Sequence, residues 1–239
     1  MSYYEEKEIS IYDYDETIVS HPLIDTCNMS IVYRLLEHLG IPCEGKRVLD
    51  VGTGTGQVSR LLRGIPGLII EACDYDQRYE GFFREHPELK DIPFLCVDIL
   101  DEKMTRRYDA AVCRGVYHHV PKLQRPLFLK KLCEIADVVI ISDEAVLEYA
   151  DNKERLAHCD QWYSYVINEA KRRGIFKLAE IESVFWKNEY QNTADDGGDF
   201  KESPSHFLED ALQVNLKPKT LERFGPWQEA SGGFFTATL

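Results

Sequence analysis

The chain has 239 residues, of which 44% are hydrophobic and 11% aromatic, a composition that excludes a disordered chain and is sufficient for a sizeable core. The length fits one large domain or two small ones. The 41 acidic and 28 basic residues give a net charge of −13, which counts against nucleic-acid binding because phosphate backbones are bound by clustered lysines and arginines. A basic groove on an otherwise acidic surface stays open as an alternative.

The sequence shows no sign of membrane insertion or export. No apolar run approaches the about 18 residues that a membrane span needs. The acidic, tyrosine-rich N-terminus lacks the cationic start and apolar centre of a signal peptide. The seven cysteines are odd in number and form no C-x-x-C pair, which is typical of reduced thiols. We therefore expect a cytoplasmic protein with no membrane partner.

The first half of the chain alternates helical and strand patterns. Helical spacing is found at Met29–Leu39, Gln57–Arg63 and Pro126–Ala136. Short apolar runs without polar alternation favour strands covered on both faces, and they lie at Val48–Val51, Leu68–Cys73, Phe94–Val97, Ala110–Cys113 and Val138–Ile141. Strands alternating with helices predict an α/β fold with a parallel, doubly wound sheet.

The second half is less regular. Apolar residues at helical spacing predict one helix over Asn152–Arg173 and another around Leu178–Phe185. The polar stretch Asn188–Ser205 is interpreted as a mobile loop or lid, with a linker as the alternative. Thr220–Phe224 and Phe234–Leu239 are separated by a segment with glycine and proline, which favours a closing antiparallel hairpin. No internal repeat and no clear linker is found, so we expect a single domain over residues 1–239.

The most informative motif is the run from Val48 to Gln57, VLDVGTGTGQ, in which a predicted strand ends at a glycine-rich turn that opens a helix. Its glycines would let the backbone turn tightly and approach a ligand closely. The dinucleotide pattern G-x-G-x-x-G fails at Gln57, and a phosphate loop would require a lysine that is absent. An acid at Asp50 suits a ligand with an ammonium group. Glycine turns also occur in many α/β folds without any cofactor.

This D-x-G-x-G-x-G arrangement resembles motif I of the class I S-adenosylmethionine (SAM) dependent methyltransferases, and the resemblance extends beyond one turn. Asp74 ends the next predicted strand, where the family places the acid that binds the ribose hydroxyls. Asp98 ends the third, where the family places the acceptor for the adenine amino group. Tyr108–Arg114 resembles the fourth-strand motif, and Gly115–Pro121 the turn that follows it in small-molecule methyltransferases.

The resemblance implies a mostly parallel, seven-stranded Rossmann-like sheet with four segments. These are an N-terminal arm and helix at 1–45, a SAM-binding core at 46–145, a helical substrate lid inserted after the fifth strand at 146–213, and a C-terminal hairpin at 214–239. The residues implied in binding SAM are Asp50, Gly52, Thr53, Gly54, Gly56, Asp74, Tyr75, Asp98, Ile99, Arg114 and Tyr14. Tyr12 and Tyr14 of the arm would close the cofactor pocket. For Asp74 and Asp98, helix capping is the alternative.

The acceptor side is less defined by the sequence. His119 follows the fourth predicted strand and is the candidate general base, with His118 and Tyr117 beside it and Glu144, after the fifth strand, as a group that orients the substrate. Helix packing is the alternative for both histidines, of which only one can face the methyl group. No metal is expected, because adjacent histidines do not easily chelate one ion and no further spacing supports zinc.

We therefore expect a SAM-dependent methyltransferase that acts on an oxygen or nitrogen atom of a small molecule such as a phenol, carboxylic acid or amine. The alternatives are an enzyme that uses SAM for a reaction other than methylation, and a regulatory subunit of the same fold. A nucleic-acid or protein methyltransferase would need a basic patch or an Asn/Asp-Pro-Pro-Tyr signature, and neither is found. The acceptor and the oligomeric state, including a homodimer, stay open.

Overall fold

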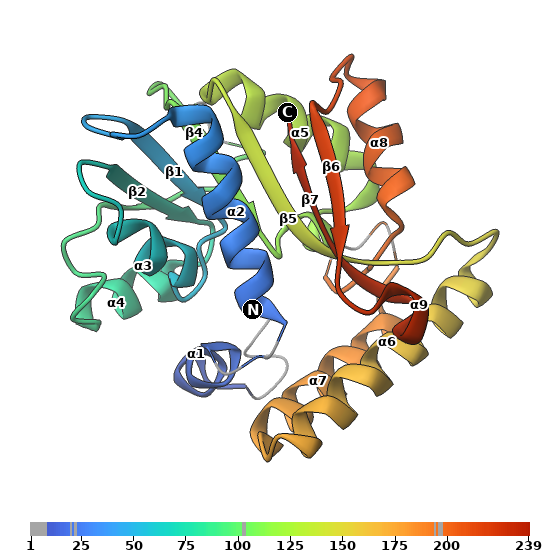
Figure 1. Ribbon diagram of the computed structural model, residues 1–239. Helices are drawn as coiled ribbons and strands as arrows, with labels where there is room; N and C mark the ends of the chain where they lie inside the picture. Colours follow the sequence, from blue (N-terminus) through green and yellow to red (C-terminus); the bar gives the residue numbers. More distant parts are fainter. Residues whose placement is uncertain (1–8, 20, 22, 102–103, 194, 196–197) are drawn as a thin grey trace.

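The computed structural model describes residues 9–19, 21, 23–101, 104–193, 195 and 198–239. Within them lies a seven-stranded sheet in the order β3-β2-β1-β4-β5-β7-β6 (Figure 1). The strands are β1 (Arg47–Val51), β2 (Ile69–Asp74), β3 (Phe94–Cys96), β4 (Ala110–Arg114), β5 (Val139–Val146), β6 (Thr220–Phe224) and β7 (Gly232–Thr238). The predicted doubly wound, mostly parallel α/β fold is confirmed.

Nine α-helices and two 3-10 turns accompany the sheet in the described part of the chain. They are α1 (Ile11–Val19), α2 (Ile24–Leu39), α3 (Gln57–Arg63), α4 (Gln77–Glu85), η1 (Tyr117–His119), η2 (Lys122–Gln124), α5 (Arg125–Ile135), α6 (Asn152–Arg172), α7 (Phe176–Gln191), α8 (Pro204–Gln213) and α9 (Trp227–Ala230). None of these helices combines the length and the apolar character that a membrane span requires.

Strands β1 to β5 pair in parallel, with β1 between β2 and β4, so their carboxyl ends meet at one edge of the sheet. Strand β7 pairs antiparallel with both β5 and β6, which confirms the predicted C-terminal hairpin. Strand order reverses beside β1, and open α/β sheets bind ligands at such a switch point.

The sheet is covered on both faces, which explains its continuous apolar strands. Neighbouring residues of one strand point to opposite faces, so Val48 and Leu49 of β1 belong to different cores. One face packs against α2, α3 and α4, and the other against α5 and α8 (Figure 1). This packing leaves the carboxyl edge of the sheet available for a site.

Helices α6 and α7 are joined by a short turn and pack against each other, as Figure 1 shows. Their shared core includes Trp162 and Tyr163 of α6 with Leu178 of α7, and it extends to Val146 at the end of β5. Trp162 and Tyr163 are almost completely buried in this core and are therefore packing residues.

The structure differs from three sequence-based expectations. Strand β3 ends at Cys96, so Asp98 lies beyond the strand and in a turn. Strand β5 continues to Val146, so Glu144 lies inside it rather than after it. The polar stretch Asn188–Ser205, expected as a mobile loop or lid with a linker as the alternative, has its ends in α7 and α8. Residues 199–203 between them are irregular but buried, and charged groups there are paired, as Lys201 is with Glu189. Residues 194 and 196–197 of that stretch lie outside the described part.

Candidate active site

The glycine turn after β1 has the strained geometry that only glycine adopts easily. Gly52, Gly54 and Gly56 have φ values of 62°, 52° and 75°, in the left-handed region. A Cβ atom on Gly52 would also collide with the Val116 side chain, and one on Gly56 would lie 2.8 Å from Phe83. The turn therefore depends on these glycines for its conformation as well as for access to the main chain.

Asp50 stabilises this turn through its side chain. Its buried carboxylate accepts hydrogen bonds of 2.7 Å from the hydroxyl groups of Thr53 and Ser59. Burial raises the pKa of Asp50, although these hydrogen bonds oppose the effect. Neither Asp50 nor Gly56 lines the adjacent cavity, so their contribution to a ligand site is to fix the turn.

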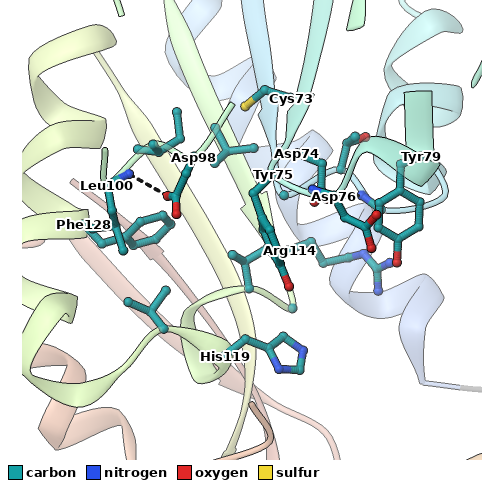
Figure 2. Close-up of a pocket in the computed structure, with 18 of the residues that line it drawn as sticks. Cys73, Asp74, Tyr75, Asp76, Tyr79, Asp98, Leu100, Arg114, His119 and Phe128 are labelled. Atoms are coloured by element: carbon teal, nitrogen blue, oxygen red, sulfur yellow. Dashed lines mark hydrogen bonds between the residues drawn. The ribbon is translucent and has the colours of Figure 1, made fainter. Parts of the chain in front are cut away.

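A cavity of about 610 Å³ opens at the carboxyl edge of the sheet. Figure 2 shows Asp74, Asp98, Arg114 and His119 around it. The predicted SAM-binding residues that line it are Gly52, Thr53, Gly54, Asp74, Tyr75, Asp98, Ile99, Arg114 and Tyr14. Tyr14 and Arg114, 100 positions apart in the sequence, thus share one cavity. Parallel pairing brings the ends of the strands together at its wall.

Asp74 ends β2 and accepts hydrogen bonds from the backbone N–H groups of Gly54, at 3.0 Å, and Asp76, at 3.1 Å. Burial raises its pKa to about 6. The N-cap of α4 is Asp76, whose side chain accepts from the backbone N–H of Arg78. The capping alternative therefore applies to Asp76, while Asp74 joins the glycine turn to the next strand.

Asp98 occupies the turn after β3, where its carboxylate accepts a 2.8 Å hydrogen bond from the Leu100 N–H (dashed in Figure 2). No helix follows it before β4 among the residues that the structure describes, so the capping alternative does not apply to it either. Phe128 of α5 also lines the cavity. Asp98 thus combines a fixed carboxylate with an apolar neighbourhood suited to a flat ring.

Arg114 ends β4 and donates through Nη2 to Gln57 Oε1 at 3.1 Å. Its Nε is buried and has no hydrogen-bond partner among the described residues, and the same holds for Gln57 Nε2. Buried donors normally find partners. Since Arg114 lines the cavity, this guanidinium is available to an anionic group of a ligand.

The two candidate catalytic histidines occupy different environments in η1. His118 is buried, and its Nδ1 lies 2.5 Å from Oδ1 of Asp143 on β5. Burial alone would raise the pKa of Asp143, but the neighbouring His118 lowers it. The Asp143 carboxylate therefore accepts the hydrogen bond, and His118 Nδ1 donates it. His118 Nε2 is thereby turned away from β5. His118 does not line the cavity.

His119 does line the cavity, and its side chain is 33% exposed. Desolvation, followed by the neighbouring His118, holds the pKa of His119 well below its usual value. Its imidazole is therefore neutral at pH 7 and can accept a proton. This matches the expectation that one histidine of the pair faces the cavity.

Sequence reasoning missed a buried cluster that faces the histidines from the insert. Asp199 Oδ1 lies 3.7 Å from His118 Nε2 and 3.9 Å from His119 Nδ1. Burial raises the pKa of Asp199 to about 6, with Lys201 opposing. Lys201 itself pairs with Glu144 at 3.2 Å and Glu189 at 3.3 Å.

Burial alone would raise the pKa of Glu144, but the charge of Lys201 lowers it to about 2. Glu144 also accepts a 3.3 Å hydrogen bond from Trp162. These partners occupy a residue that was expected to orient a substrate. The only sequence signal for the cluster was acids and a lysine flanking Phe200, which does not distinguish a loop from a buried network.

The two tyrosines of α1 have different surroundings. Tyr14 lines the cavity, and its ring lies edge-on to Phe185 of α7 with centroids 6.4 Å apart. Tyr12 is 60% exposed, donates to Glu85 on α4 at 2.7 Å, and does not line the cavity. Only Tyr14 is placed where it can cover a ligand.

The comparison with family models identifies the chain. Residues 29–194 match a family described as a methyltransferase domain, which is more than half of the sequence. The chain therefore belongs to this family, and the identification as a class I SAM-dependent methyltransferase is confirmed.

One curated relative is the ubiquinone biosynthesis O-methyltransferase of Coxiella burnetii (strain RSA 493 / Nine Mile phase I), 34% identical over 88 residues. The match covers 36% of this chain and 37% of the relative, so it spans little more than a third of either protein.

Two solved structures share the fold. The DhpI–S-adenosylhomocysteine complex has a TM-score of 0.58 at 18% identity and covers 95% of this chain and 89% of its own. The 1,6-didemethyltoxoflavin-N1-methyltransferase of Burkholderia thailandensis, with its acceptor and S-adenosylhomocysteine bound, has a TM-score of 0.54 at 14% identity and covers 100% of this chain and 89% of its own.

Proposed function

We propose that this enzyme transfers the methyl group of SAM to an oxygen or nitrogen atom of a small molecule. The observation that carries this function is a single cavity whose wall combines the glycine turn, the carboxylates of Asp74 and Asp98, and the neutral imidazole of His119. Its volume of about 610 Å³ is in the usual range for small-ligand sites.

The cavity residues fit the parts of SAM. The Asp74 carboxylate would accept hydrogen bonds from the ribose hydroxyls, and Asp98 from the adenine amino group. The backbone of Gly52–Gly54 leaves room for the amino-acid portion, and the unpartnered Nε of Arg114 offers a donor to its carboxylate. When bound, SAM supplies a methyl group already activated by its sulfonium charge.

The protein itself would exclude water from the reaction and accept the proton that the acceptor loses. Helix α1 and the residue that follows α7 contribute Tyr14 and Asn192 to the cavity wall, where they would keep water from the reacting atoms. His119 would accept the proton that a hydroxyl or amine loses on methylation. The hydrogen bond from His118 to Asp143 would fix the orientation of the two adjacent histidines.

Several features support a small acceptor in the cytoplasm. The net charge of −13 disfavours nucleic acid, and the seven cysteines are free thiols. The C. burnetii relative is an O-methyltransferase and the B. thailandensis structure an N-methyltransferase, so both acceptor atoms belong to the proposal. A homodimer is part of the proposal as well, with one such cavity in each chain.

Calorimetry and an activity assay test this function. We expect SAM and S-adenosylhomocysteine to bind with dissociation constants of about micromolar size, a binding free energy near −8 kcal/mol. Labelled SAM incubated with a panel of phenols, carboxylic acids and amines should label one acceptor class. Absence of binding by both ligands in a folded protein would exclude the proposed function.

A further inference from the structure

Three potential metal ligands converge beside the cavity. His118, His119 and Asp199 each offer one ligand atom, and these atoms lie within 4.8 Å of one another. Both histidines come from η1, and Asp199 comes from the segment after α7. The imidazole rings of the adjacent histidines have centroids 3.9 Å apart and an interplanar angle of 43°, so the tight 3-10 turn places both on the same side. The argument from sequence that adjacent histidines do not chelate one ion does not hold for this geometry.

The ligand atoms are oriented by a second set of buried groups. His118 Nδ1 donates to Asp143, which leaves Nε2 toward Asp199. Asn188 of α7 donates to Asp199 Oδ2 at 3.0 Å, which leaves Oδ1 toward the histidines. Histidines that bind metals usually donate their other ring nitrogen to a carboxylate, and ligating carboxylates are held by hydrogen bonds in the same way.

The local charge also favours a cation. Two carboxylates, Asp143 and Asp199, contact the histidine pair, and both are buried. The nearby ammonium group belongs to Lys201, and its charge is shared with Glu144 and Glu189, which it contacts at 3.2 and 3.3 Å. Buried carboxylates are stable when paired or when they coordinate a metal.

We propose that His118, His119 and Asp199 form a binding site for a divalent transition-metal ion such as Zn²⁺ or Co²⁺. Two imidazoles and one carboxylate are a donor set that such ions accept, and three protein ligands leave a position open. His119 lines the cavity, so the open position faces the acceptor side of the proposed methyltransferase site.

This inference rests on the proposed function and specifies its acceptor, a molecule whose hydroxyl group coordinates the ion. Coordination lowers the pKa of a bound hydroxyl group, as it does for water. The hydroxyl proton passes to solvent, the oxygen forms a bond to the methyl carbon, and the sulfonium sulfur keeps the electrons of the broken C–S bond. His119 then serves as a ligand, and it acts as the base only in the metal-free chain.

Titration with the metal alone tests the site. The full chain is treated with a chelator and dialysed, and Co²⁺ is added while its visible d–d absorption is followed, with Zn²⁺ then added as a competitor. We expect one Co²⁺ per chain with an intense low-coordinate spectrum that Zn²⁺ abolishes. A folded wild-type chain that gives no such spectrum would overturn the proposal.

Three variants locate the ion. Asp199→Asn and His119→Ala should each weaken Co²⁺ binding at least about 10-fold, as should Asp143→Asn, since outer-sphere changes cost about 10–100-fold. Asp195→Asn removes an equal charge from an exposed position of the same segment and should bind as the wild type does. Unchanged affinity in folded Asp199→Asn and His119→Ala chains would place the ion elsewhere and overturn the proposal. SAM calorimetry on the metal-free chain separates the two ideas, because retained SAM binding leaves the methyltransferase function intact when the metal site fails.

Discussion

The proposed cofactor side and the proposed acceptor side of the cavity are built in different ways. The cofactor side uses short segments at the ends of β1, β2, β3 and β4, and each segment carries its own local signature of glycine or aspartate. The acceptor side joins η1, β5 and the segment after α7, whose charged residues meet only in the folded chain. A local signature survives in a single sequence, whereas a network of distant partners has none.

The two sides also differ in electrostatics. Asp74 and Asp98 accept hydrogen bonds mainly from backbone N–H groups, which leave other carboxylate lone pairs available to a ligand. On the acceptor side, charged side chains neutralise one another, as in the group of Lys201, Glu144 and Glu189. Substitutions on the cofactor side should therefore change ligand affinity, whereas those on the acceptor side should change turnover or stability.

The largest effect is expected for His119→Ala on the acceptor side. In the metal-free chain, where His119 acts as the base, loss of this imidazole should lower the turnover number about 10²–10⁴-fold, the usual range for removal of a general base, while SAM affinity changes little. The exposed His38→Ala variant is the control for loss of a histidine elsewhere. Steady-state kinetics and SAM calorimetry on both chains measure this, and a fully active His119→Ala chain with a lowered Tm would mean that η1 only packs.

His118→Ala sharpens the same comparison, because this residue is buried against Asp143. Its removal leaves a buried carboxylate without its partner, so the Tm should fall more than for His119→Ala. Turnover per folded molecule should fall less, since His118 does not line the cavity.

On the cofactor side, Asp74→Ala should weaken SAM binding by about 1.5–3 kcal/mol, the usual size of a hydrogen bond to a charged group. The fold should persist, because the lost bonds to Gly54 and Asp76 lie at a turn. Asp91→Ala, at a 66% exposed side chain, is the matched control. Calorimetry that shows equal affinities for both variants would point to another ribose contact.

Most residues predicted for the cofactor side line one cavity, and the reason is visible in particular residues. The glycine turn and Asp74 lie at the ends of short apolar strands, which the sequence pattern predicts. Parallel pairing of these strands then brings the two ends together. Asp50 was also singled out, but its carboxylate bonds to Thr53 and Ser59 and does not face the cavity. A sequence pattern indicates that an acid is needed at such a turn and does not reveal what it contacts.

The acceptor side was predicted only through the His118–His119 pair. Asp199 and Lys201 lie in a polar stretch, and polarity alone favours an exposed loop. Their burial depends on partners up to about 80 residues away, including His118 and Glu189. Glu144 was predicted to orient a substrate, but it forms an ion pair with Lys201. This contact between β5 and the segment after α7 joins distant parts of the chain, so no local sequence pattern predicts it.

A buried acid of α7, close enough to Glu144 and Lys201 to be affected by their charges, gives a prediction for stability against pH. Burial raises the pKa of Glu182 on α7 to about 8, with Glu144 adding to this and Lys201 opposing, and burial lowers the pKa of His21 to about 4. Both partners of this 3.7 Å contact are therefore neutral at pH 7.

Because the folded pKa of Glu182 lies above its unfolded value of about 4.5, its contribution to stability is present at low pH and is lost as pH rises toward 8. The lowered pKa of His21 offsets this loss below about pH 6.5, so the Tm of the wild type should fall mainly between about pH 6.5 and 8 and then level off, and Glu182→Gln should flatten this fall. Parallel slopes for the two chains in thermal denaturation would show that another group is responsible.

The smallest expected effect separates the two tyrosines of α1, which the sequence placed together. Tyr14 lines the cavity beside the glycine turn, so Tyr14→Ala should expose a bound cofactor and weaken SAM binding a few-fold. Tyr12 contacts Phe82 and Glu85 on α4 and lies outside the cavity, so Tyr12→Ala should leave SAM affinity unchanged. The lost surface hydrogen bond should lower stability by no more than about 1 kcal/mol. Calorimetry on both variants decides between a specific cover and a general role of the arm: equal losses would mean that α1 acts only by docking on α4 and α7, and that neither ring touches the cofactor.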